Sequence, residues 1–129
     1  MRTFIILISI LLTQASWACY APRSGQEFDD LIKLEKLSDL NKYRVTAPRK
    51  LENLNNPEIT LTYTESNAES ASINEPHETL KPSSTSAVVS AEFTVKNKGK
   101  GKPYIVVSWS PKECCPCGIH AQTKYIDIE

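Results

Sequence analysis

The sequence predicts a mainly β protein: an antiparallel β-sandwich preceded by one N-terminal helix. Three observations lead to this fold class. Apolar residues recur at helical spacing only near the start of the chain, and farther along they alternate with polar residues at period two. The length of 129 residues, shortened by an N-terminal export signal, suits one domain.

Residues 1–18 have the three-part pattern of a secretory signal peptide. Arg2 precedes an uncharged apolar run at residues 4–12, and small or polar residues follow up to Ala18. We expect cleavage after Ala18, with cleavage after Ala15 as the alternative. The mature protein would then be exported, either to a periplasm or by secretion.

Cleavage after Ala18 would leave Cys19 at the mature N-terminus, where bacterial lipoproteins carry their lipid. Trp17 stands where a lipobox has a small residue, so lipidation is the alternative rather than the first expectation. A membrane is expected as a partner only if Cys19 is lipidated.

The charge balance gives no reason to expect nucleic acid as a partner. The whole chain has 15 basic and 15 acidic side chains, and the signal segment contains Arg2 as its only charge. A mature net charge near zero provides no basic surface for nucleic acid or for an anionic membrane.

The segment 19–41 is expected to hold an N-terminal stretch and an amphipathic helix from Gly25 to Leu40. Ser24 and Glu27 have the spacing of a capping box. Large apolar residues then recur at three- and four-residue intervals, at Phe28, Leu31, Ile32, Leu34, Leu37 and Leu40. We expect this helix to pack on the body of the domain.

The rest of the chain, residues 42–129, is expected to form the sandwich. Period-two alternation is clear in 58–64, where Ile59, Leu61 and Tyr63 share one face. The predicted strands are Tyr43–Ala47, Glu58–Thr64 and three more within 87–96, 103–110 and 119–129.

Two polar segments interrupt these strands. Residues 65–86 predict a long flexible loop or one containing a weak edge strand, and His77 is expected to be an exposed loop histidine. Residues 97–103 carry three lysines and two glycines, and predict a solvated hairpin tip between the third and fourth strands.

The segment "AEFTVKNKGKGKPYIVVSW" resembles the central hairpin of bacterial immunoglobulin-like modules, in which a strand ending in Val-x-Asn leads through a Gly-containing turn into an aliphatic strand. The resemblance covers about twenty residues and lacks the core cysteines and tryptophan of antibody domains. It implies an immunoglobulin-like sandwich and no activity.

Four cysteines, Cys19, Cys114, Cys115 and Cys117, predict a disulfide framework in an exported chain. Neighbouring cysteines are too close to pair without strain. A Cys115-Pro116-Cys117-Gly118 turn would direct the cysteines outward to a partner such as Cys19. The preferred pairing is Cys19 with Cys115 and Cys114 with Cys117, and the even number of cysteines is better founded than this connectivity.

A metal or thiol-redox site is the alternative use of the same cluster. Cys114, Cys115, Cys117 and His120 are ligands suited to zinc or copper, although structural zinc sites usually gather two separated ligand pairs. Redox chemistry would need a helix after the Cys-x-x-Cys spacing, and strand-like sequence follows instead.

No catalytic residues and no cofactor can be assigned from the sequence. A Cys117–His120 pair lacks a third group to orient the histidine, and the carboxylates are scattered. We therefore expect a non-enzymatic protein-binding or structural module of the inhibitor, immunity or envelope-assembly type. A periplasmic metal-binding or thiol-redox protein is the alternative.

Overall fold

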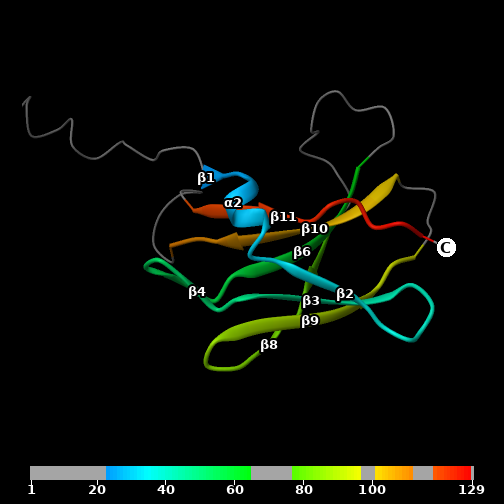
Figure 1. The fold of residues 1–129 in the computed structure, drawn as a ribbon, viewed down its shortest axis with the longest axis horizontal. Coiled ribbons are helices and arrows are strands. Elements are labelled where there is room, and N and C mark those ends of the chain that lie inside the picture. Colours follow the sequence, from blue (N-terminus) through cyan, green and yellow to red (C-terminus); the bar gives the residue numbers. More distant parts are fainter. Residues whose placement is uncertain (1–22, 65–76, 97–100, 112–117, 129) are drawn as a thin grey trace, which may run out of the picture.

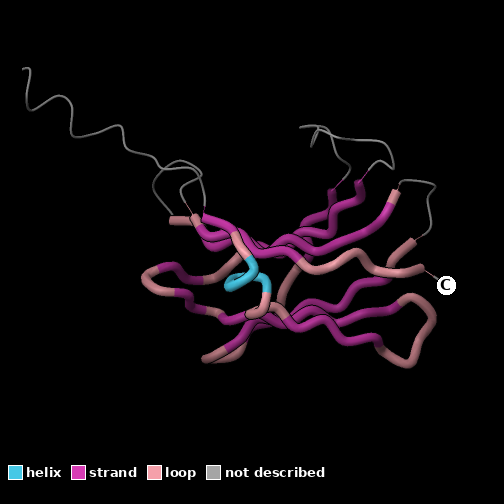
Figure 2. The backbone as a smooth tube through the Cα atoms, turned by 45° about the horizontal axis from the view of Figure 1, so that its top comes forward, coloured by secondary structure: helices cyan, strands magenta, loops and turns pink. Residues whose placement is uncertain are grey.

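A computed structural model describes residues 23–64, 77–96, 101–111 and 118–128. These residues form two main β-sheets packed face to face, with one short helix beside them (Figures 1 and 2). The strand order is β1-β11-β10-β6-β7 in the first sheet and β2-β3-β9-β8 in the second. The prediction of a mainly β fold with two packed sheets is therefore confirmed.

The strands are short at the edges of both sheets and longer in the middle. The first sheet contains β1 (Arg23–Ser24), β11 (Ile119–Gln122), β10 (Lys102–Trp109), β6 (Glu58–Thr64) and β7 (His77–Leu80). The second contains β2 (Lys33–Lys36), β3 (Lys42–Pro48), β9 (Val88–Thr94) and β8 (Ser83–Ser84), and β4 (Lys50–Leu51) pairs with β5 (Leu54–Asn55) as a separate ribbon. All these pairs are antiparallel except β1 with β11, which is parallel.

Alternating burial along the central strands produces the core between the sheets. Trp109 is fully buried, and its indole Nε1–H donates to the carbonyl oxygen of Pro48 at 3.0 Å, which links β10 to the end of β3 in the other sheet. Because the buried indole N–H needs a hydrogen-bond acceptor, this bond helps to hold the two sheets in one arrangement. The core residues are Tyr43, Val45, Ala47, Ile59, Leu61, Tyr63, Leu80, Val89, Ala91, Phe93, Val95, Ile105, Val107, Trp109, Ile119, Ala121 and Ile126.

The predicted helix is much shorter than expected. α2 covers Gln26–Asp29 only, and Lys33–Lys36 forms β2, which pairs with β3. The prediction of a helix from Gly25 to Leu40 is thus wrong beyond its first turn. Lys-Leu-Glu-Lys fits both periods, and pairing with the exposed edge of β3 outweighs the helical preference of these residues.

The segment around 97–103 is not a hairpin tip. β9 pairs with β3 and β8, whereas β10 pairs with β6 and β11, so the chain crosses from one sheet to the other between them. The strands were correctly predicted, but their direct pairing was wrong. The alternation of apolar and polar residues predicts a strand but not which strand it pairs with.

The described part of the loop 65–86 contains the two short edge strands β7 and β8. One of the two expectations for this loop included a weak edge strand, and the structure supplies one in each sheet. Within the described ranges, no helix is long and apolar enough to cross a membrane.

Candidate functional site

One side of the sandwich is only partly closed. β1 pairs with β11 at the edge of the first sheet, and the chain then passes through α2 into β2, the edge strand of the second sheet. Figure 2 shows α2 lying between the two layers on this side. Because α2 has four residues, it covers only the part of the opening next to β1.

The helix is attached to the last strand by Asp29. Its Oδ1 accepts a hydrogen bond of 2.8 Å from the backbone N–H of Gln122, beyond the point where β1 stops pairing with β11. Phe28 and Ile32, on either side of this contact, pack against the core. The carboxylate thus satisfies an edge N–H that would otherwise lack a strand partner.

β11 ends in a distortion that turns side chains outward. The N–H of Thr123 donates to the carbonyl of Ile105 at 2.9 Å, while its Oγ1 accepts from the N–H of Ile105 at 3.0 Å. The next backbone bond is from Ile126 to the carbonyl of Pro103, 2.8 Å long. Three steps on one strand match two on β10, which is the residue count of a β-bulge.

The bulged segment presents Tyr125 at the surface. Its side chain is 56% exposed and packs edge to face with Tyr104, the ring centroids being 5.8 Å apart. The ammonium nitrogen of Lys102 lies 5.8 Å from the centre of the Tyr125 ring. Exposed aromatic side chains such as this one are enriched in protein interfaces.

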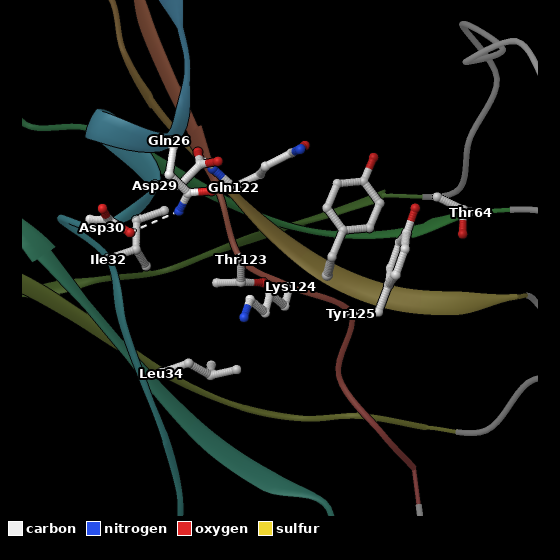
Figure 3. Close-up of a pocket in the computed structure, with 11 residues that line it drawn as sticks. Gln26, Asp29, Asp30, Ile32, Leu34, Thr64, Gln122, Thr123, Lys124 and Tyr125 are labelled. Carbon is white, nitrogen blue, oxygen red and sulfur yellow. Dashed lines mark hydrogen bonds between the residues drawn. The ribbon is translucent and has the colours of Figure 1, made fainter.

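These features border an open groove of about 1050 Å³, shown in Figure 3. One wall comes from α2 and the start of β2, and the other from the residues at and after the end of β11 and from β10 and β6 of the same sheet. The lining residues are Gln26, Asp29, Asp30, Ile32, Leu34, Thr64, Tyr104, Gln122, Thr123, Lys124 and Tyr125.

Charge and polarity change along this groove. Asp29 and Asp30 lie at the α2 end, where Gln26 donates to Asp30 at 2.8 Å. Leu34, 36% exposed, gives the β2 wall its apolar part. Lys124 lies between this acidic end and Tyr125 (Figure 3), and Lys102 lies beside the Tyr125 ring, so the groove has acidic side chains at one end and basic and aromatic ones toward the other.

A smaller hollow of about 390 Å³ lies around His120, beside the start of α2. His120 is opposite Ser24 in the parallel pairing, and Asp29 contributes to the same lining. It is the one residue of the predicted metal set that the structure describes. Within the described residues, no group of three or more His, Cys, Asp or Glu side chains could hold a metal ion.

The cysteines of the predicted site, Cys19, Cys114, Cys115 and Cys117, lie outside the described residues. The prediction of disulfides and its zinc or copper alternative therefore stay predictions. His77 begins β7, and its backbone is opposite Thr62 of β6.

The outer face of the second sheet has paired charges. Arg44 donates to Glu92 Oε1 from Nη2 at 2.6 Å and from Nε at 3.2 Å. This hydrogen bonding, more than the attraction of Arg44 and Lys42, holds the pKa of Glu92 below its ordinary value and raises that of Arg44. Because these charges are matched within the chain, this face is a weaker candidate for recognition than the groove.

Sequence reasoning missed the groove residues. Tyr125 and Lys124 were assigned to a regular last strand, and Asp29 to a long helix. One signal was available: Thr123-Lys124-Tyr125 breaks the alternation that leads into Ile126 and Ile128. No family model, curated protein or solved structure matches this chain.

Proposed function

We propose that this protein is an exported, non-enzymatic binding module, of the inhibitor, immunity or envelope-assembly type, which contacts another protein through the groove beside β2. The carrying observation is that an exposed aromatic side chain, Tyr125, and a half-exposed apolar one, Leu34, line the same open groove. Protein interfaces concentrate such residues with a polar rim.

The proposal includes a covalent link between the N-terminus and the last strand. The N–H of Arg23 donates to the carbonyl of Gly118 at 2.9 Å, so the described residues nearest Cys19 and Cys117 are neighbours. This proximity supports a bond from Cys19 to the cysteine cluster. The preferred pairing is Cys19 with Cys115, with Cys114 and Cys117 forming the second bond.

Export follows from the proposed signal peptide, and an oxidising compartment would keep these bonds formed. The protein would be periplasmic or secreted, with a lipid anchor on Cys19 as the alternative. Its partner is a protein and not nucleic acid, because the balanced charge gives no basic surface. The immunoglobulin-like resemblance belongs to the same proposal, and the crossing from β9 to β10 between sheets is compatible with a Greek-key sandwich.

A photo-crosslinking amino acid in place of Tyr125 tests the function in cells that export the full chain. We expect one dominant crosslinked protein, lost when Leu34→Lys is added in the same chain. The same amino acid at Thr94, on the outer face of the second sheet, is the matched control and should give no such product. Equal products at both positions, or none at Tyr125, would reject the groove as the binding surface.

Metal analysis separates the alternative function. Protein purified from the oxidising compartment should have no free thiols and no bound metal. About one zinc or copper per chain that disappears in Cys117→Ser would instead favour the metal-binding function and its ligands Cys114, Cys115, Cys117 and His120.

A further inference from the structure

The free edge of β2 borders the groove along its apolar part. β2 pairs with β3 on one side, and no described strand pairs with its other side. The N–H of Leu37 donates to the carbonyl of Lys42 at 2.8 Å, which fixes the alternation of the ladder. Leu34, three residues earlier, therefore directs its backbone N–H and C=O away from β3.

The side chain of Leu34 lines the groove next to this edge and offers an apolar contact to a bound segment. Leu34 is opposite the fully buried Val45 and faces the same side as that residue, toward the space between the sheets. The two flanking residues, Lys33 and Glu35, are on the outer face of the sheet. An added strand would thus meet the backbone groups of Leu34, which no described strand pairs, together with its apolar side chain.

The two walls of the groove together supply charges of both signs. Asp29 and Asp30 lie at the α2 end, and Lys124 lies farther along toward Tyr125 (Figure 3). Lys102, which does not line the groove, lies beside the Tyr125 ring. A segment of about six extended residues, at roughly 3.3 Å per residue, spans a distance of about 20 Å. A basic side chain of the segment near Asp29 and Asp30, and an acidic one near Lys124, would set the direction in which it lies.

We propose that the partner docks by strand addition: an extended segment, carrying a basic residue, then apolar residues, then an acidic residue, lies in the groove along the free edge of β2. This inference rests on the proposed function and names the partner's contacting element. Main-chain hydrogen bonds would give affinity, and the charge gradient would select direction. The charges of the partner are thereby complementary to those of the groove.

A displayed library of random eight-residue peptides, selected against the full disulfide-bonded chain, tests the inference. We expect enriched peptides to share the basic-apolar-acidic order. Their Kd should rise at least about tenfold for Leu34→Lys, which removes the apolar contact. Lys124→Glu should raise the Kd of these peptides about two- to fivefold. The same variant should bind more tightly those peptides in which lysine replaces the acidic residue.

Lys50→Glu, an exposed charge change on β4, is the matched control and should leave the Kd unchanged. Enriched peptides without the charge order, or peptides insensitive to Leu34→Lys, would overturn strand addition. If the Tyr125 crosslink forms normally while no peptide is enriched, the partner binds by a folded surface, and only this inference fails. If both experiments give nothing, the proposed function fails with it.

Discussion

The carboxylate of Asp29 accepts a hydrogen bond from the backbone N–H of Gln122 at 2.8 Å, across 93 positions of sequence. It joins the short helix to the last strand at the point where β1 no longer covers that strand. One wall of the groove is therefore held by the same contact that completes the edge of the sheet.

Asp29→Ala should destabilise the fold by about 1 kcal/mol, because the N–H of Gln122 loses its acceptor. Asp29→Asn keeps an oxygen at the same position and should cost less than half as much. Urea unfolding monitored by Trp fluorescence measures both. Equal losses in the two variants would show that charge, not the hydrogen bond, carries the effect.

Gly118→Ala should destabilise the protein by about 1–3 kcal/mol, in the range of overpacked sites. A Cβ at Gly118 would overlap the carbonyl oxygen of Trp109, a backbone atom that can move only if the pairing of β10 with β11 shifts. Thermal unfolding of the purified variant provides the measurement.

Gly25→Ala is the control for this substitution. A Cβ at Gly25 would meet nothing within 4 Å, and its φ of 161° is extended backbone open to any residue. Its stability should stay within about 0.5 kcal/mol of the parent protein. A comparable loss at both glycines would argue against the close approach of Gly118 to Trp109.

The Arg44–Glu92 pair makes stability depend on pH on the acid side. The hydrogen bond from Arg44 holds the folded-state pKa of Glu92 below its ordinary value of 4.5. The stabilisation is therefore complete above that value and is lost as the pH falls through the lower folded pKa. In Arg44→Gln, carboxyl NMR titration should show the pKa of Glu92 moving up toward 4.5.

Arg23→Gln breaks a different exposed ion pair, with Glu52, and should leave the titration of Glu92 unchanged. If Glu92 titrates identically in the parent protein and in Arg44→Gln, the ion pair does not persist in solution. The direction of the shift would then have to come from Lys42 alone, which lies 3.5 Å from Glu92.

The central strands were predictable because their burial is simple. Glu58–Thr64 has one apolar face, and the structure gives it those bounds. Which strands pair was not predictable, since β9 and β10 show the same alternation whether they form a hairpin or lie in different sheets. Long-range partners, not local preference, decide such cases.

The groove was harder to foresee than the sheets. Leu34 fits a helical stripe as well as a strand, and only the edge of β3 decides between them. Tyr125 lies in a bulge whose position depends on Thr123 bonding to Ile105 with both its backbone and its hydroxyl. The alternation of apolar and polar residues in the sequence does not show that the hydroxyl of Thr123, and not its backbone carbonyl, accepts the hydrogen bond from Ile105.

The last prediction concerns the pairing of the four cysteines. Peptide mapping without reduction should recover Cys19 joined to Cys115 and Cys114 joined to Cys117. A bond from Cys19 to Cys115 closes a loop of nearly a hundred residues and lowers the conformational entropy of the unfolded chain. The chain-entropy model gives a stabilisation of up to about 4.7 kcal/mol for such a loop, and about 2–4 kcal/mol is typical of measured disulfides. Cys19→Ser should lower the free energy of unfolding by that typical amount.

Double substitutions separate this pairing from its alternatives. If Cys19 and Cys115 are partners, Cys19→Ser combined with Cys115→Ser should cost no more than either change alone, because the second removes nothing further. Cys114→Ser with Cys117→Ser should cost much less, since that bond closes only a short loop and excludes few unfolded conformations. Additive losses for Cys19 and Cys115 would assign Cys19 to another member of the cluster, and recovery of four free thiols would remove the covalent link altogether.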